Sequence, residues 1–280
     1  MLRFLKNTVE KIAISDFRNA SGSTWEKAME EIESLIKILG VKPEISVWKD
    51  KKGREYKNFT ISYCGKVDKK ILIGAHYDTF EKSPGADDNA SSIAVMLGLI
   101  KTINNCYSGY YSLDIVFYAC EEPPFFGTPQ MGSYKDALKR TKNEIKVMIC
   151  LEMVGYYSDK ANSQDYPFKF LKYVYGDKGN FLIGVTNLKS SLLGIKIISK
   201  LNKYRSKFYR KLIIPFNFSG MDWSDHRSYW SRNIPAIMLT DTAMFRNSNY
   251  HTEKDIPSSL DYNRMSNLVS DLFNLLNDFD

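Results

Sequence analysis

Four short runs of almost entirely apolar residues constrain the fold of this chain more than any other feature of its sequence. They cover residues 70–75, 113–119, 147–151 and 234–239. A strand that is buried on both faces has such a run, whereas a strand with one wet face alternates apolar and polar residues. We therefore predict that the runs form the central strands of an open α/β sheet.

Helical periodicity in other segments supports this class of fold. Helices are predicted for residues 24–39, 90–103, 190–203 and 260–279. Residues 45–48 and 59–63 are typical of two strands joined by a hairpin-type turn. Residues 156–220 are the least patterned segment, so we predict an insertion there, or a lid over the site, within a single domain of residues 1–280.

Composition and charge exclude several classes of protein. The formal net charge is +7, but the lysines are scattered and no nucleic-acid-binding motif is present. No stretch approaches the ~20 apolar residues of a membrane-spanning helix, and the first residues lack the continuous apolar segment of a signal peptide. The four cysteines have no paired spacing, which is typical of reduced thiols. We therefore expect a cytoplasmic protein that binds neither nucleic acid nor membranes.

Each of the three histidines lies beside a carboxylate. His76 is followed by Asp78, Asp225 precedes His226, and an acidic segment follows His251. Imidazole and carboxylate groups together form the ligand set of zinc-class metal ions. Taken alone, His76 is equally well interpreted as a strand-end histidine beside a solvated aspartate. The pair Asp225 and His226 is equally compatible with the lining of a pocket and with a structural tie.

Carboxylates also follow the apolar runs, at the edge of the sheet where open α/β proteins bind ligands. Asp87 and Asp88 follow Pro-Gly, which taken alone favours a turn and helix cap over a metal bridge. Glu121 and Glu122 would point to opposite faces, so one can bind metal while the other acts as general base; a solvated pair is the alternative. Glu152 ends an apolar run, and a lone buried carboxylate is costly, which favours a functional role.

Taken in order, these segments resemble the co-catalytic zinc aminopeptidases of peptidase family M28. The matching motifs are HYDT, PGADDNASS, EE, LEMVGYYS, SDH, IPAIMLTDT and YHTEKDIPSSLDY, and they span residues 70–262. Each motif is short, but the ordered set is specific to that family. The resemblance implies an α/β fold of the zinc-exopeptidase, phosphorylase/hydrolase-like type: a three-layer α/β/α sandwich with a mixed central sheet.

The resemblance also implies two Zn²⁺ ions, or other divalent ions, and a set of protein ligands. His76 and Glu152 would bind one ion. Glu122 and His251 would bind the second ion, and Asp88 would bridge the two. All five of these positions carry ligand-type residues in this chain, which favours an active enzyme over a noncatalytic binding protein on the same scaffold.

Two catalytic roles follow from the resemblance as well. Glu121 would be the general base that takes a proton from the attacking water, and Asp78 would orient the imidazole of His76. The family also leads us to expect a cis peptide bond between Asp88 and Asn89. The substrate would be a peptide with a free N-terminus, cleaved after its first residue.

The chain departs from the family pattern at two positions. Glu152 occupies a position that is more often aspartate in characterised aminopeptidases. Those enzymes often have a tyrosine just before SDH, where this chain has Met221, so Tyr250 is the remaining candidate for contacting the oxyanion. Alternatives with the same fold are a single-zinc glutaminyl cyclase and a carboxypeptidase-like enzyme, in which Arg246 would bind a carboxylate.

Overall fold

The computed structural model describes residues 1–104, 106–214 and 220–280 of the chain. These residues form an eight-stranded sheet in the order β1-β2-β4-β3-β5-β8-β6-β7. The strands are β1 Glu44–Lys49, β2 Glu55–Tyr63, β3 Val67–His76, β4 Tyr111–Tyr118, β5 Ile145–Glu152, β6 Leu182–Asn187, β7 Tyr209–Ile214 and β8 Ala236–Thr240. The four apolar runs of the sequence are the adjacent strands β4, β3, β5 and β8, which confirms the predicted centre of the sheet.

The sheet is mixed. Strands β4, β3, β5 and β8 run parallel to one another. At one edge the hairpin β1–β2 joins β4 in antiparallel register, and at the other edge β6 pairs with β8 antiparallel and with β7 parallel. The carboxyl ends of the four central strands therefore meet at one edge of the sheet, where the predicted site residues follow them.

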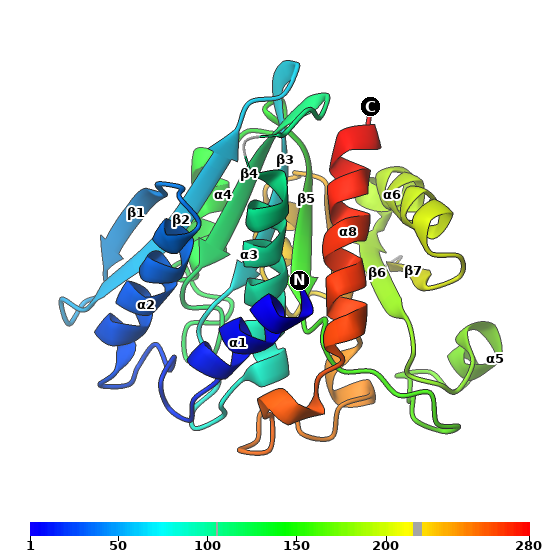
Figure 1. Ribbon diagram of the computed structural model, residues 1–280. Coiled ribbons are helices and arrows are strands. Elements are labelled where there is room, and N and C mark those ends of the chain that lie inside the picture. Colours follow the sequence, from blue (N-terminus) through cyan, green and yellow to red (C-terminus); the bar gives the residue numbers. More distant parts are fainter. Residues whose placement is uncertain (105, 215–219) are drawn as a thin grey trace.

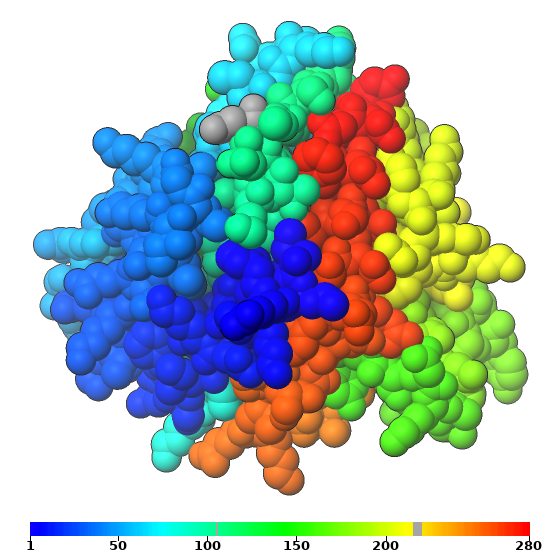
Figure 2. Space-filling model, viewed as in Figure 1, coloured from blue at the N-terminus to red at the C-terminus, as the bar shows by residue number. Residues whose placement is uncertain are grey.

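Helices cover both faces of the sheet and make the predicted three layers (Figure 1). The helices are α1 Leu2–Ile12, α2 Trp25–Ile38, α3 Ser92–Ile103, α4 Gly132–Lys139, α5 Leu171–Tyr175, α6 Ser191–Tyr204, α7 His226–Ser231 and α8 Tyr262–Asp278. In the surface view, α1 lies against α3 and α8 on one face of the molecule (Figure 2). Helices α4 and α7 pack together, and α7 contacts β5 and β8.

The two faces of the sheet bury separate apolar cores because alternate strand residues point to opposite sides. In β3, Ile71 and Ile73 belong to the core beneath α1, α3 and α8. Leu72, between them, belongs to the core that includes Ala137 of α4 and Tyr229 of α7. A strand with both faces buried in this way needs an apolar residue at nearly every position, which accounts for the runs.

The structure corrects the prediction for residues 156–220. Strands β6 and β7 belong to the main sheet, and α6 packs against them and against α8, so this part is integral to the domain. Among the described residues of this segment, the stretch up to β6, which contains the short helix α5, lies outside the layers (Figure 1). Residues 215–219 of the predicted insertion lie outside the described residues. The sequence of β6 is short and interrupted by Gly184, which hid its strand character.

Two further observations concern the expected reduced thiols and the expected lack of a membrane-spanning helix. All four cysteines are free, two of them buried and two exposed. Among the described residues, none of the helices combines the length and apolar character that crossing a bilayer requires.

Candidate active site

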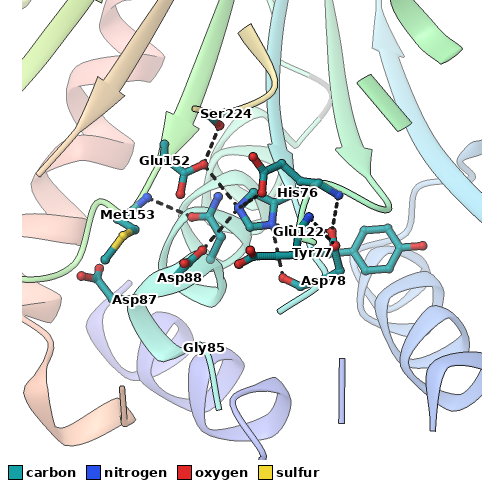
Figure 3. A network of polar contacts seen from close by, with 12 residues as sticks. His76, Tyr77, Asp78, Gly85, Asp87, Asp88, Glu122, Glu152, Met153 and Ser224 are labelled. Atoms are coloured by element: carbon teal, nitrogen blue, oxygen red, sulfur yellow. Dashed lines mark hydrogen bonds and ion pairs between the residues drawn. The ribbon is translucent and has the colours of Figure 1, made fainter. Parts of the chain in front are cut away.

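Side chains from five distant segments meet at the carboxyl edge of the central strands (Figure 3). His76 is the last residue of β3, and Glu152 is the last residue of β5. Glu122 lies just beyond the end of β4, whose Tyr118 pairs with His76 in parallel register. Asp88 comes from the irregular helical turn Ala86–Ser91 that precedes α3.

His251, from the loop that follows β8, completes the group. Its Nε2 lies 3.1 Å from Asp88 Oδ2 and 3.3 Å from Glu122 Oε1. On the opposite side, His76 Nε2 lies 3.4 Å from Asp88 Oδ1 and 3.3 Å from Glu152 Oε2. The two oxygens of Asp88 thus face two different imidazoles, and each imidazole has a glutamate of its own. The structure brings all five predicted metal-ligating residues together.

Unpartnered polar atoms in the site fit a bound cation. His76 Nε2, Asp88 Oδ1 and Glu122 Oε1 are buried and make no hydrogen bond. One ligand atom from each of these residues lies within 4.8 Å of the others. Buried polar groups without partners are costly, and a nitrogen-and-oxygen donor set of this kind suits a zinc-class divalent ion. The residues present therefore fit a metal centre.

Burial and mutual repulsion perturb the ionisation of these groups. Burial, reinforced by the charge of Asp88, raises the pKa of Glu122 to about 8. Burial lowers the pKa of His251, but contacts with the carboxylates of Asp88 and Glu122 outweigh it and raise this pKa to about 10. The chain thus holds protons where several carboxylates share a dry space, and divalent cations would replace those protons.

Glu121 lies beside this group without making the close contacts of the other five. Its Oε2 is 3.9 Å from His76 Nε2, and its side chain is buried. Burial raises the pKa of Glu121 well above its usual value, and the charge of Glu122 raises it further. A carboxyl group in this environment holds a proton more tightly than an ordinary one, which suits a general base.

Asp78 contacts the imidazole of His76, the residue that it is predicted to orient, and also the Glu121–Glu122 pair. The Nδ1 of His76 hydrogen-bonds the backbone carbonyl of Asp78 at 3.2 Å, whereas the carboxylate Oδ1 is 3.6 Å away. The Asp78 carboxylate instead accepts hydrogen bonds from the backbone N–H groups of Glu121 and Glu122, at 3.0 and 2.9 Å. Asp78 therefore orients His76 mainly through its backbone and holds the Glu121–Glu122 pair with its side chain.

Two supporting residues carry no role in the sequence-based prediction. Ser224 donates a hydrogen bond of 2.5 Å to Glu152 Oε2. Asp255 accepts from the backbone N–H groups of Asp87 and Asp88, both at 3.0 Å, and so fixes the turn that carries Asp88. Ser224 is the serine of the SDH motif and Asp255 lies four residues after His251, so both were adjacent to recognised motifs.

The turn around Asp88 is further tied to β5. Asn89 donates to the carbonyl of Leu151 and accepts from the N–H of Met153, both at 3.1 Å. The peptide bond between Asp88 and Asn89 is cis, as expected. Asp87 accepts from Gly155 N–H at 2.9 Å and is a structural tie, not a bridge between metal ions.

Aromatic rings hold His251 in place. Its imidazole is stacked between Phe80, at 4.2 Å between ring centroids, and Tyr250, at 3.7 Å. Tyr250 also lines the cleft that contains Asp88 and Glu121. This position keeps Tyr250 as a candidate for contact with the substrate.

Asp225, His226 and Arg246 lie outside the group of five residues that contact one another. Asp225 is buried, and burial raises its pKa to about 7. His226 Nε2 lies 3.0 Å from the carbonyl of Met221, and burial lowers the pKa of His226 to about 4, so this histidine is a structural tie. Arg246 is buried and donates to Gln164 Oε1 at 2.8 Å and to the carbonyl of Tyr156 at 3.2 Å, and it is not among the residues that line the cleft, so these contacts favour a structural role over binding of a substrate carboxylate.

An apolar pocket adjoins the cleft. It contains about 720 Å³ of empty space, part of it open to solvent. Its apolar lining includes Leu171, Ile183, Val185, Leu212, Met221, Met238 and Phe245. Glu152, Trp223 and Tyr250 line both the pocket and the cleft, so the two spaces adjoin at the site.

Comparison with known sequences identifies relatives of the whole domain. The family model for Peptidase family M28 matches residues 58–275. The chain is 36% identical to the Escherichia coli K12 protein YfbL over 232 residues, which are 80% of this chain and 71% of that protein. It is 24% identical to a probable leucine aminopeptidase of Trichophyton verrucosum over 278 residues, 92% of this chain. The chain spans 65% of the length of that fungal relative.

Comparison with solved structures confirms the fold. LapB from Legionella pneumophila has a TM-score of 0.74 at 18% identity, over 100% of this chain and 73% of that one. The glutaminyl cyclase of Tannerella forsythia has a TM-score of 0.69 at 15% identity, over 100% of this chain and 99% of that one.

Proposed function

Because this chain belongs to Peptidase family M28, we propose that it is a zinc-dependent aminopeptidase that removes apolar N-terminal residues from peptides. The observation that carries the proposal is the position of Asp88. Its two carboxylate oxygens face His76 and His251, at 3.4 and 3.1 Å from the respective Nε2 atoms. A carboxylate placed between two imidazoles in this way is suited to bridging two ions.

The ligand groups follow from these contacts. His76 and Glu152 would hold one ion, Glu122 and His251 would hold the other, and Asp88 would contribute one oxygen to each. When bound, two such ions supply Lewis-acid polarisation of the scissile carbonyl and acidify the attacking water. Ser224 would keep Glu152 in position through the hydrogen bond to Oε2.

Glu121 would move the protons of the reaction. Its carboxylate lines the cleft beside the ligands, and its raised pKa suits a group that accepts a proton from the attacking water. The same group would then deliver that proton to the amine that leaves. The Asp78 carboxylate accepts hydrogen bonds from the backbone N–H groups of Glu121 and Glu122, so it holds the proposed base and the neighbouring proposed ligand in position.

The adjoining pocket supports the choice of substrate. Its walls are apolar and it opens into the cleft beside Glu152. A substrate whose scissile carbonyl lies in the cleft would place the side chain of its first residue in this pocket. The carboxylates of the cleft would attract the free amino group. Large apolar residues such as leucine therefore fit better than glycine or charged residues.

Metal analysis of the purified protein tests the centre. We expect about two zinc ions per chain. One ion per chain would instead favour a glutaminyl cyclase-like enzyme, and none would favour a noncatalytic binding protein. A leucyl amide substrate should be hydrolysed, an N-acetylated one should not, and a chelator should abolish the activity.

Glu121→Gln and Glu122→Gln form a matched pair that separates catalysis from metal binding. Glu121→Gln should keep both ions and lower kcat by about 10²- to 10⁴-fold, the usual contribution of a general base. Glu122→Gln should lower the zinc content. Wild-type turnover in Glu121→Gln would disprove the assignment of the base.

A further inference from the structure

Arg18, in the segment between α1 and α2, is completely buried. Its guanidinium donates hydrogen bonds to four backbone carbonyls. Nε bonds Ile12 O at 2.9 Å, and Nη1 bonds Tyr77 O at 2.9 Å. Nη2 bonds Pro84 O at 3.1 Å and Gly85 O at 2.6 Å. A buried guanidinium that is satisfied by backbone groups from three segments holds those segments at set distances.

Three of the four carbonyls belong to the loop that joins two of the proposed metal ligands. Tyr77 directly follows His76, and Gly85 directly precedes the turn Ala86–Ser91 that carries Asp88. One planar guanidinium thus fastens both ends of this loop. Because its N–H groups form a rigid fork, the relative positions of the two loop ends depend on it.

Neighbouring residues of the same segment hold the middle of the loop. The carbonyl of Arg18 accepts from Thr79 N–H at 3.1 Å. Ser15 Oγ donates to Lys82 O at 2.7 Å, and Asn19 donates to the carbonyl of Glu81 at 3.3 Å. The segment from Ser15 to Asn19 therefore follows the loop along its length, with Arg18 as the buried contact.

Packing around Gly85 leaves the loop little freedom. Gly85 has φ +63°, and a Cβ atom there would lie 2.3 Å from Asp88 O and 2.8 Å from Arg18 Nη2. Gly85 thus separates the guanidinium from the backbone of Asp88. Any residue with a side chain at this position would displace one of these two groups. A shift of the guanidinium would be passed directly to the backbone of Asp88.

The charge of Arg18 also acts on the site. Burial lowers the pKa of Arg18 to about 10, with Asp88 and Asp255 as the leading opposing influences, so the group is positively charged at neutral pH. A fixed cation at this place reduces the repulsion among the carboxylates before metal binds. Lysine would keep the charge but cannot reproduce the fork of donors, which allows the two effects to be separated.

We propose that Arg18 is a positioning residue of the metal centre, whose hydrogen bonds to the two ends of the 77–85 loop set the separation of His76 and Asp88. The inference rests on the proposed function, because it takes these two side chains to be metal ligands. It assigns the N-terminal segment, which contributes no ligand, a direct part in metal affinity.

The test compares Arg18→Lys with Arg54→Lys. Arg54 donates to the carbonyl of Ala20 at 3.0 Å, so it binds the same N-terminal segment but not the 77–85 loop. Zinc affinity is measured by competition with a chromophoric chelator, and Co²⁺-substituted protein is examined by absorption spectroscopy. Circular dichroism of the metal-free proteins reports folding separately.

We expect Arg18→Lys to bind zinc about 10- to 100-fold more weakly, the range typical of groups that support metal ligands, and to alter the Co²⁺ spectrum. Arg54→Lys should bind zinc as the wild type does. Wild-type zinc affinity and Co²⁺ spectrum in folded Arg18→Lys would overturn the inference and leave the proposed function intact. Absence of zinc binding by the wild type would overturn both.

A second variant covers the case in which Arg18→Lys does not fold. The double variant Ser15→Ala/Asn19→Ala removes the two outer hydrogen bonds to the loop, together with the bond that Asn19 accepts from Ser21 N–H, and changes no fully buried side chain. It should fold and lose zinc affinity by a factor of about three or more, since each neutral hydrogen bond contributes roughly 0.5–1.5 kcal/mol. Unchanged zinc affinity in this variant would refute the role of the N-terminal segment.

Discussion

Substitution of Val185 by phenylalanine tests whether the apolar pocket selects the substrate. Val185 lies on β6, pairs with Met238 of β8, and is 2% exposed. Both side chains line the pocket beside Glu152. The added ring of Val185→Phe would extend into the empty space, because the strand and core behind it are close-packed.

The size of the effect follows from the burial of the substrate side chain. Complete burial of a leucine side chain contributes about 1.5–3 kcal/mol. At about 1.36 kcal/mol for each tenfold change in rate, kcat/KM for a leucyl substrate should exceed that for a glycyl one by about 10- to 150-fold. With the pocket filled, we expect this advantage to fall below about threefold, which is the loss of most of the transfer free energy.

The assay is the ratio of kcat/KM for leucyl and glycyl amides. Overpacking costs about 1–3 kcal/mol of stability, but a smaller active fraction lowers both rates equally and leaves the ratio unchanged. Val147→Phe is the matched control, since Val147 is a buried strand valine on β5 in the core on the other face of the sheet. If Val185→Phe left the ratio of the two rates unchanged, the pocket would not hold the first side chain of the substrate.

Other perturbations address the metal centre and the scaffold. Ser224→Ala removes the donor to Glu152 and should weaken zinc binding about 10- to 100-fold, measured by chelator competition; unchanged affinity would contradict the supporting role. Chelation should lower the melting temperature by roughly 9 °C, because two ions at a hundred times their Kd each contribute about 2.7 kcal/mol; calorimetry with no shift would oppose a resident metal. Burial raises the pKa of Asp114, but the charge of Arg140 outweighs burial, so the pKa of Asp114 in the folded protein is lowered. Asp114 therefore contributes to the free energy of unfolding at neutral pH, and this contribution is lost as the pH falls through the folded pKa. Urea unfolding should therefore find Asp114→Asn destabilised by about 3–5 kcal/mol at pH 7, and by less at pH 3; a difference independent of pH would refute this.

Much of the proposed site was predictable because strand ends and the proposed metal ligands coincide. A strand buried on both faces leaves a clear apolar run, and the run points to the residue that follows it. His76 and Glu152 are the last residues of such strands, and Glu122 lies just beyond one. The order of the motifs then placed His251 in the same ligand set, which the hydrophobic periodicity alone could not do.

The rest depended on contacts for which the sequence has no pattern. The carboxylate of Asp78 binds backbone N–H groups, and any residue except proline offers one, so its partners carry no signature. Arg18 is a single arginine in a polar segment, and only the fold reveals that it is buried. Arg246 was linked to a substrate by its nearness to His251 in the chain, but its guanidinium points to Gln164.

The order of the proposed ligands along the chain, with His251 and Asp255 after all the others, has a consequence for biosynthesis. Four of the proposed ligands precede β6 in the chain, whereas the fifth and the aspartate that fixes the turn around Asp88 leave the ribosome only with the loop after β8. Domains fold as units while the nascent polypeptide lengthens. In a growing chain the proposed centre therefore stays incomplete until the loop after β8 has emerged, so hydrolytic capacity would appear only after all eight strands have been made.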